Sequence, residues 1–286
     1  MRLSAEAPAK INRELRVGRL RSDGYHEVFS RMVSIDLSDR LTVESSEDLR
    51  FSCDDPAVPT GEDNLVVRAA RRLSRAAGTP AKAAIRLEKR TPMGGGLGGG
   101  SADAAIALKL LAELWHCPPE IRTSLPGLAA EIGSDVPFFL FGGQADVTGR
   151  GEIVQPVDDA PPRPLVLLVP PFTVSTAAVY RAYAGRGRLP RRLAIDDPGR
   201  ASFLGPNDLT PAVLQVEPRM EAYLASAARV SEERAVCGSG STIVLAAPHE
   251  ARDELARHHP EARLFVCTTL ARGAYRLRTN PNGGSS

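Results

Sequence analysis

One stretch decides the fold: Lys89-Arg90-Thr91-Pro92-Met93-Gly94-Gly95-Gly96-Leu97-Gly98-Gly99-Gly100-Ser101-Ala102-Asp103-Ala104-Ala105. Six of the seven residues from 94 to 100 are glycine, so the backbone can adopt positive φ angles and can approach a ligand closely. Residues 103–115 are rich in Ala, Leu and Lys and contain no Gly or Pro, which predicts a helix directly after the loop. The unpaired N–H groups and the macrodipole at a helix start favour a negative charge. The stretch therefore predicts a phosphate-binding loop.

Three known phosphate-binding motifs do not account for this stretch. A Walker A loop aligned on 94–101 has Gly100 where its lysine must be. A dinucleotide fingerprint fits Gly94, Gly96 and Gly99, but so dense a glycine run fits it almost automatically, and no clear second strand ending in an acidic residue follows. The His-Arg-Asp and Asp-Phe-Gly motifs of protein kinases do not occur. A flexible linker is a weak alternative, because strand-like residues 84–87 precede the loop and a helix follows it.

Composition is that of a globular enzyme. The chain has 286 residues and a formal net charge of +2, so it is long enough for a substantial core, and its scattered charges do not indicate a nucleic-acid or membrane partner. It has no apolar run of the roughly 20 residues that span a bilayer and no signal peptide at its start, so we expect a cytoplasmic protein. The four cysteines lie far apart without a Cys-x-x-Cys pair, which predicts reduced thiols, mostly buried.

The pattern of apolar residues and breakers predicts an alternation of strands and helices. The expected strands and helices of the first half are strand 5–20, strand 29–37, strand material at 39–51, helix 66–77 and helix 121–132. A proline cluster at 156–164 marks the best domain boundary. Beyond it we expect strand 165–169, helix 177–183, strand 243–246, helix 249–258 and strand 263–268. The predicted domains are 1–160 and 161–280, followed by a flexible tail at 281–286.

Two motifs place charged groups beside apolar segments. The first is Pro8-Ala9-Lys10-Ile11-Asn12, in a strand that we expect to be buried on one face only. A lysine on the other face of such a strand is usually a solvated charge. In the second, Asp135 precedes a wholly apolar run at 136–139, where partial desolvation would strengthen its interaction with a nearby cation. The alternative for Asp135 is a helix cap or a turn residue.

A third motif is suited to binding a base. Asp23-Gly24 predicts a turn, and Tyr25 and His26 follow it. An aromatic ring offers a base a stacking face worth about 1–3 kcal/mol, and an imidazole or backbone group can read the base edge. The alternative is a hairpin tyrosine that packs on the sheet beside an exposed histidine.

The run from Pro92 to Ala105 resembles the central motif of the GHMP kinases, named after galactokinase, homoserine kinase, mevalonate kinase and phosphomevalonate kinase. Two flanking motifs of that family have counterparts, at 8–12 and in the Cys237-Gly238-Ser239-Gly240-Ser241-Thr242 loop. The resemblance implies an α+β fold of two domains, with a ribosomal-protein-S5-like N-terminal domain and a ferredoxin-like C-terminal domain. It also implies ATP as phosphate donor and Mg²⁺, whose ligands the sequence does not identify.

Asp23-Gly24-Tyr25-His26 is similar to a signature of one GHMP branch, which phosphorylates the 2-hydroxyl of 4-diphosphocytidyl-2-C-methyl-D-erythritol in non-mevalonate isoprenoid biosynthesis. The alternatives are another GHMP alcohol kinase, of the homoserine or mevalonate type, or a non-catalytic nucleotide-binding regulator, which would be expected to lack Lys10 or Asp135. The implied partner is a small cytidine diphosphate compound, and the chain would act as a monomer or homodimer. The segment Arg13-Glu14 departs from the branch, which more often carries apolar residues there.

The resemblance also implies a role for each matching residue. The catalytic pair would be Lys10 and Asp135. The acceptor substrate would be bound by Asn12, Tyr25, His26, Thr176 and Tyr180. The nucleotide would be bound by Asn64, Lys89, Pro92, Met93, Gly94, Gly95, Gly96, Leu97, Gly98, Gly99, Gly100, Ser101, Ala102, Gly238, Ser239 and Gly240.

Overall fold

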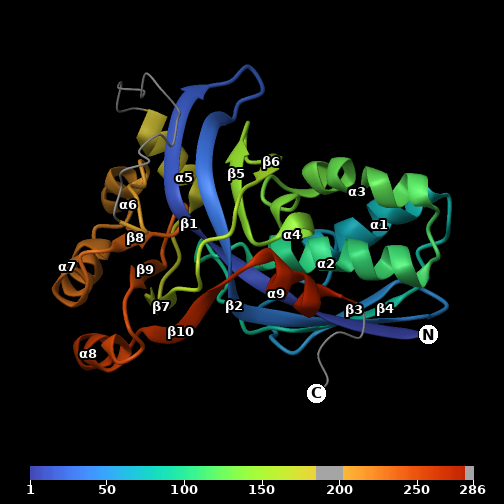
Figure 1. Ribbon diagram of the computed structural model, residues 1–286. Coiled ribbons are helices and arrows are strands. Elements are labelled where there is room, and N and C mark those ends of the chain that lie inside the picture. The colour runs from blue at the N-terminus through green and yellow to red at the C-terminus, as the bar shows by residue number, and fades with distance from the viewer. Residues whose placement is uncertain (185–201, 281–286) are drawn as a thin grey trace.

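The computed structural model describes residues 1–184 and 202–280. Within them, ten strands are joined in one hydrogen-bonded sheet, along the order β3-β4-β2-β10-β7-β9-β8 with β1 and β5 beside β2 and β6 beside β5. Helices of the first half gather on one side of their strands, and those of the second half, except the last helix of the described residues, lie at the opposite end of the molecule (Figure 1). The predicted tail at 281–286 lies outside the described residues.

A long hairpin connects the two halves. Strands β1 (Arg2–Leu20) and β2 (His26–Glu44) pair antiparallel over nearly their whole length. Leu3 and Ala5 belong to the core under the first helices, Ile11 to a central cluster, and Val17 to the core of the second half. The register shifts between Pro8 and Lys10, and such a bulge changes the direction of the side chains that follow it.

The first half is built around α2 (Gly99–Leu114), which is buried on nearly every side. It packs against α1 (Leu65–Ala77), α3 (Pro119–Ile132) and the β1–β2 hairpin. The remaining elements of this half are β3 (Arg50–Cys53), β4 (Ala84–Glu88), α4 (Phe138–Phe141), β5 (Gln144–Thr148) and β6 (Ile153–Pro156).

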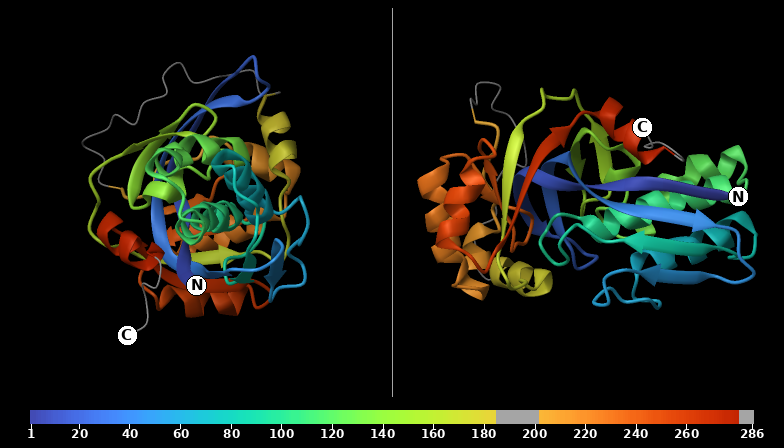
Figure 2. Two further views of the ribbon diagram at one scale, coloured as in Figure 1. Left: turned by 90° about the vertical axis from the view of Figure 1, so that its right-hand side faces the viewer. Right: turned by 90° about the horizontal axis from the view of Figure 1, so that it is seen from below.

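The second half contributes four strands and the helices on them. They are β7 (Pro164–Val169), α5 (Thr176–Ala184), α6 (Thr210–Val216), α7 (Met220–Val230), β8 (Arg234–Val236), β9 (Ile243–Ala246), α8 (Ala251–His258) and β10 (Arg263–Leu270). The end of β10 pairs with β2, so the sheet continues between the halves. Helix α9 (Arg272–Thr279) then returns to the first half and packs against β1 (Figure 2).

Most predicted elements are present, and two expectations are wrong. The strand material expected at 39–51 is interrupted: β2 ends at Glu44 and β3 begins at Arg50. The strand expected to be buried on one face only is covered on both, because Lys10, Asn12 and Glu14 are buried as well as Ile11. The helix predicted from residue 103 already begins at Gly99, inside the glycine run.

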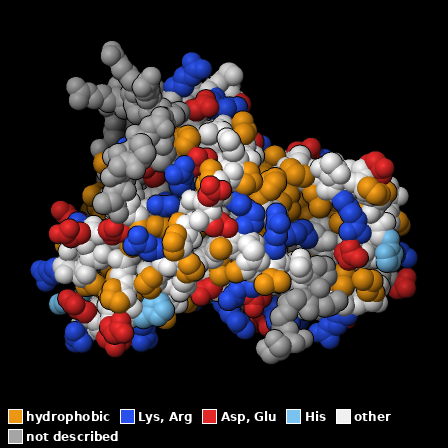
Figure 3. All heavy atoms as spheres, in the orientation of Figure 1, with side chains coloured by type: hydrophobic (Ala, Val, Ile, Leu, Met, Phe, Trp, Pro, Cys, Tyr) orange, Lys and Arg blue, Asp and Glu red, His pale blue; other side chains and the backbone are white. Residues whose placement is uncertain are grey.

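Surface charges and thiols agree with what the composition predicted. On the face drawn in Figure 3, basic and acidic side chains both occur across the surface with apolar ones between them. All four cysteines are free thiols, and Cys117, Cys237 and Cys267 are buried, as predicted. Among the helices of the described residues, none has the length and apolarity needed to cross a membrane.

Candidate active site

A cavity of about 610 Å³ lies between the halves of the molecule and is lined by elements of both. The sequence-predicted residues that line it are Lys10, Asn12, Asn64, Lys89, Pro92, Met93, Gly94, Gly95, Gly96, Leu97, Gly98, Gly99, Gly100, Ser101, Asp135, Thr176, Tyr180, Gly238 and Ser239. Four predicted residues do not line it: Tyr25, His26, Ala102 and Gly240. The structure therefore brings most of the predicted site together from six separate segments.

The glycine run forms one wall because side chains would not fit. At Gly96, where φ is +77°, a Cβ would lie 2.0 Å from the Cys237 carbonyl oxygen. At Gly98, where φ is +72°, a Cβ would lie 2.8 Å from Cζ of Phe139 and 3.1 Å from Cε of Lys10. No side chain caps α2 after Gly98, so the N–H groups of its first turn are available to an anion.

Lys10 and Asp135 meet in the cavity. The Lys10 Nζ lies 3.4 Å from Asp135 Oδ2, and the two side chains are 3% and 33% exposed. Lys10 is therefore not a solvated edge charge. Asp135 does not cap a helix either, because the C-cap of α3 is Gly133 and the N-cap of α4 is Pro137. A buried cation therefore lies beside a partly exposed carboxylate that a ligand in the cavity can reach.

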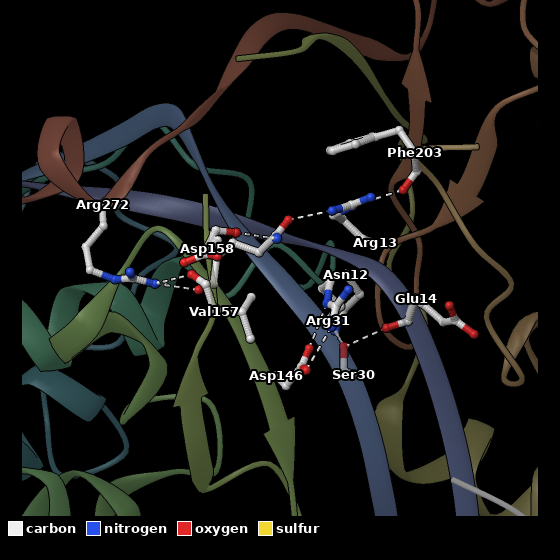
Figure 4. Close-up of polar contacts among 11 residues, drawn as sticks. Asn12, Arg13, Glu14, Ser30, Arg31, Asp146, Val157, Asp158, Phe203 and Arg272 are labelled. Carbon is white, nitrogen blue, oxygen red and sulfur yellow. Dashed lines mark hydrogen bonds and ion pairs between the residues drawn. The ribbon is translucent and has the colours of Figure 1, made fainter. Parts of the chain in front are cut away.

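A chain of hydrogen bonds fixes Lys10. Its Nζ donates to Asn12 Oδ1 at 2.7 Å and to the Gly96 carbonyl at 3.0 Å. The Asn12 amide donates to Ser30 Oγ at 2.7 Å, and Ser30 donates to the Glu14 carbonyl at 2.8 Å, as Figure 4 shows for these last three residues. Because Ser30 accepts from Nδ2, the oxygen of the Asn12 amide is left facing Lys10.

Lys89 is held by two carboxylates. Its Nζ lies 2.6 Å from Asp39 Oδ2 and 2.7 Å from Asp103 Oδ2. Burial alone would lower the pKa of Lys89, but the two carboxylates raise it. Burial raises the pKa of Asp103 to about 8 even though Lys89 opposes the shift. The other oxygen of Asp39 accepts the N–H groups of Arg90 and Thr91, so this cluster fixes the start of the glycine loop.

Asn64 is also engaged within the protein. Its Oδ1 accepts from the Val66 N–H at 2.8 Å, and its Nδ2 donates to the Pro59 carbonyl at 2.7 Å. It is the N-cap of α1, and this position places the start of α1 at the cavity wall.

Two of the predicted base-binding residues, Tyr25 and His26, lie at the rim of the cavity, beside the residues that line it. Tyr25 is 51% exposed, whereas His26 is buried with its Nδ1 2.9 Å from the Gly18 carbonyl oxygen. The alternative of a packed tyrosine beside an exposed histidine is therefore wrong. The His26 ring lies 5.7 Å from that of Tyr180, which does line the cavity. Burial, and then the charge of Asp135, raise the pKa of Tyr180.

The loop at 237–242 closes the cavity from the second half. Ser239 Oγ and Thr176 Oγ1 share a hydrogen bond of 2.7 Å, which ties this loop to the start of α5. Gly240 takes part in the turn itself through a bond from its N–H to the Cys237 carbonyl, and Ala102 is buried in the core around α2. The second-half motifs thus meet the glycine loop directly.

Sequence reasoning missed several cavity residues. Ser30 lies near the start of β2 with no motif around it, and only the pairing of β2 with β1 brings its hydroxyl to Asn12 and Glu14. Arg150 and Gly151 also line the cavity, although the segment 148–152 gave only a turn signal. The glycines around Arg150 were the available clue, since two of them flank a single charged residue.

Comparisons with known proteins find related sequences and related folds. The family model of the GHMP kinases N terminal domain matches residues 64–143. The 4-diphosphocytidyl-2-C-methyl-D-erythritol kinase of Anaeromyxobacter dehalogenans is 42% identical over 254 residues, which are 85% of this chain and 80% of that protein. A crystal structure of 4-(cytidine 5'-diphospho)-2C-methyl-D-erythritol kinase is 34% identical with a TM-score of 0.77, over 93% of this chain and 98% of the other. Homoserine kinase from Cytophaga hutchinsonii, at 17% identity and a TM-score of 0.68 over 94% of this chain and 95% of its own, shares the fold alone.

Proposed function

The chain belongs to the GHMP kinases, in the branch of the 4-diphosphocytidyl-2-C-methyl-D-erythritol kinases, and from this we propose that it transfers the γ-phosphate of ATP to the 2-hydroxyl of 4-diphosphocytidyl-2-C-methyl-D-erythritol. The product is an intermediate of the non-mevalonate route to isoprenoid precursors. The observation that carries the proposal is the 3.4 Å contact of Lys10 with Asp135 in the same cavity as the uncapped start of α2.

The glycine loop suits the phosphates of ATP. A Cβ at Gly99 would lie 2.9 Å from Thr91 Cγ2 and 3.0 Å from Lys89 Nζ, so only glycine lets the first turn of α2 pack this closely on those two side chains. The N–H groups of that turn have no side-chain cap and suit phosphate oxygens. Asn64 and Lys89 line the neighbouring part of the cavity, where the rest of the nucleotide would lie.

The residues around the glycine loop fit a magnesium ion that is bound mainly through the phosphates of ATP. The described residues contain no group of three or more His, Cys, Asp or Glu side chains placed to hold a metal. Phosphate oxygens and water would therefore supply most of its ligands, as is usual for Mg²⁺, and Ser101 offers a hydroxyl at the cavity wall. When bound, the ion would neutralise charge on the phosphates. Because ATP is the donor, we place this activity in the cytoplasm.

The chemistry follows from the positions of Asp135 and Lys10. The 2-hydroxyl attacks the γ-phosphorus, the bond from that phosphorus to the bridging oxygen of ADP breaks, and the hydroxyl proton passes to Asp135. Lys10 stabilises the negative charge that develops on the attacking oxygen. Asn12, oriented by Ser30, holds the Lys10 ammonium in place.

The cytosine would be bound at the rim. We assign Tyr25 and Tyr180 to the two faces of the base and His26 to its edge, with Thr176 at the sugar. The buried His26 ring between Tyr180 and Tyr183 supports this assignment, because its packing fixes the hairpin that carries Tyr25.

The test is a coupled assay of ATP consumption with three acceptors: the cytidyl compound, homoserine and mevalonate. We expect turnover with the first alone. Asp135→Asn and Lys10→Met should each lower kcat by about 10²-fold or more, and the double variant should be far less than multiplicatively worse, because the two residues act as one unit.

Asp48→Asn is the matched control, since it makes the same change at an exposed turn residue and should leave kcat unaltered. Titrations of Asp135→Asn with ATP and with the cytidyl acceptor should still show binding of both. Normal turnover by Asp135→Asn would mean that another carboxylate accepts the proton.

A further inference from the structure

Three cationic side chains line the cavity, and one of them is available to a ligand. Lys10 is paired with Asp135, and Lys89 is paired with Asp39 and Asp103. Within residues 1–184 and 202–280, Arg150 forms no ion pair, and its Nη2 donates a hydrogen bond to the Ala130 carbonyl at 2.8 Å. Its remaining N–H groups are free to bind an anion.

The turn that carries Arg150 is firmly placed beside Asp135. The Val28 N–H donates to the Gly149 carbonyl at 2.7 Å, and the Arg150 N–H donates to Glu152 Oε2 at 2.7 Å. At Gly151, where φ is +124°, a Cβ would lie only 3.5 Å from Asp135 Oδ1. The backbone of this turn therefore lies close beside the Asp135 carboxylate.

The side chain of Arg150 extends in the other direction, to the rim. Its guanidinium carbon lies 5.2 Å from the centre of the Tyr25 ring, within the range of a cation–π contact. The guanidinium covers one face of that ring and leaves the other to a stacked base. Arg150 thus lies between the proposed base site and the proposed site of proton transfer.

We propose that Arg150 determines specificity by binding the diphosphate of the acceptor substrate while holding Tyr25 in position for the base. This inference rests on the proposed function, in which a base binds at Tyr25 and a hydroxyl reacts at Asp135. A diphosphate joins those two ends of the acceptor and must lie between them. The planar fork of an arginine matches two phosphate oxygens at once.

The test compares cytidine with cytidine diphosphate (CDP) by calorimetric titration. Arg150→Gln removes the charge and should weaken CDP binding by about 10- to 100-fold, the range for hydrogen bonds to a charged group. Its affinity for cytidine should fall by about threefold or less, since the stacking ring remains. In steady-state kinetics the KM for the acceptor should rise by a similar factor while the KM for ATP stays within about twofold.

Arg19→Gln is the matched control. Arg19 is an exposed arginine near the tip of the β1–β2 hairpin, which carries Tyr25, and it does not line the cavity. It should retain the wild-type preference for CDP over cytidine. Arg150→Lys keeps a point charge but loses the fork, so its preference should lie between those of wild type and Arg150→Gln. Thermal melts establish that each variant is folded, and Arg150→Lys decides the question if Arg150→Gln is not.

An unchanged preference for CDP in both Arg150 variants, with active wild-type enzyme, would overturn the assignment of Arg150 and leave the proposed function intact. A wild-type protein that neither binds CDP nor phosphorylates the cytidyl acceptor would overturn both. The titration of wild type with cytidine and CDP therefore distinguishes a failure of the Arg150 assignment from a failure of the proposed function.

Discussion

Replacing Gly98 by alanine tests whether the glycine loop and Lys10, the proposed catalytic lysine, are packed against each other. The added Cβ would stand 2.8 Å from Phe139 Cζ and 3.1 Å from Lys10 Cε. Both neighbours are nearly inaccessible to solvent, at 0% and 3% exposure, so neither can move away cheaply. The substitution should therefore damage stability and catalysis together.

The cost in stability has three parts. An L-residue at φ = +72° loses about 1–2 kcal/mol relative to glycine, and overpacking of a tight core costs about 1–3 kcal/mol more. The smaller entropy of the unfolded chain returns about 0.4–1 kcal/mol. We expect the free energy of unfolding to fall by about 2–4 kcal/mol, measured by denaturant titration.

Catalysis should fall because Lys10 must shift away from Asp135, and a displacement of about 1 Å at a reacting group can cost about 10²-fold. The matched control is Gly127→Ala, at an exposed position in α3 with no neighbour within 4 Å of the new Cβ. It should raise the free energy of unfolding by about 0.5–1 kcal/mol and leave kcat unaltered. If Gly98→Ala keeps the stability and kcat of the wild type, the close packing of this loop on Lys10 is wrong.

Three further changes probe other parts of the molecule. Tyr25→Ala should weaken binding of the cytidyl acceptor by about 1–3 kcal/mol with little change for ATP, and free methylerythritol phosphate should be a poor acceptor; equal rates with and without the cytidyl group would contradict stacking. Ser30→Ala leaves the Asn12 amide without its acceptor and should lower kcat about tenfold with an unchanged KM for ATP; a normal kcat would remove Ser30 from the positioning of Lys10. Burial, and then Arg276, lower the pKa of Lys109 from 10.5 to about 8, so between these values the unfolded chain binds more protons and stability rises with pH. The free energy of unfolding of wild type relative to Lys109→Met should rise by about 2–3 kcal/mol across that window, and parallel pH curves would show that Lys109 titrates normally.

The parts of the fold that sequence predicted are those encoded locally. The glycine loop can be predicted from composition, because only glycine permits the φ of Gly96 and its close approach to the Cys237 carbonyl. The helix after the loop follows from an uninterrupted run of helix-forming residues. The meeting of Lys10 with Asp135 is different: the two are far apart in the chain, and it was the resemblance to a kinase family that paired them.

Long-range polar contacts could not be predicted, and Arg13 illustrates why. Its position departs from the family pattern, yet its side chain is well used: Nε donates to the Phe203 carbonyl at 3.0 Å and Nη1 to Gln144 Oε1 at 2.5 Å (Figure 4). Arg272 donates to the Gln144 carbonyl at 2.6 Å from the other side. Each partner lies more than 100 residues away, so no local spacing reveals the network. Glu14 accepts Arg16 at 2.6 Å, which lets this buried carboxylate replace an apolar residue.

The β1–β2 hairpin places chemistry and recognition on one element. Lys10 lies on β1, Tyr25 immediately precedes β2, and Ser30 on β2 orients Asn12 toward Lys10. Since the hairpin runs through the cores of both halves, its register is fixed wherever a face is buried. A slip of one residue would move the Lys10 ammonium and the Tyr25 ring together, so the acceptor would lose its proposed base contact and the cation beside Asp135 at once. Proposed acceptor selection and phosphoryl transfer thus depend on a single register, while the donor loop is fixed independently by α2 and the Lys89 carboxylate cluster.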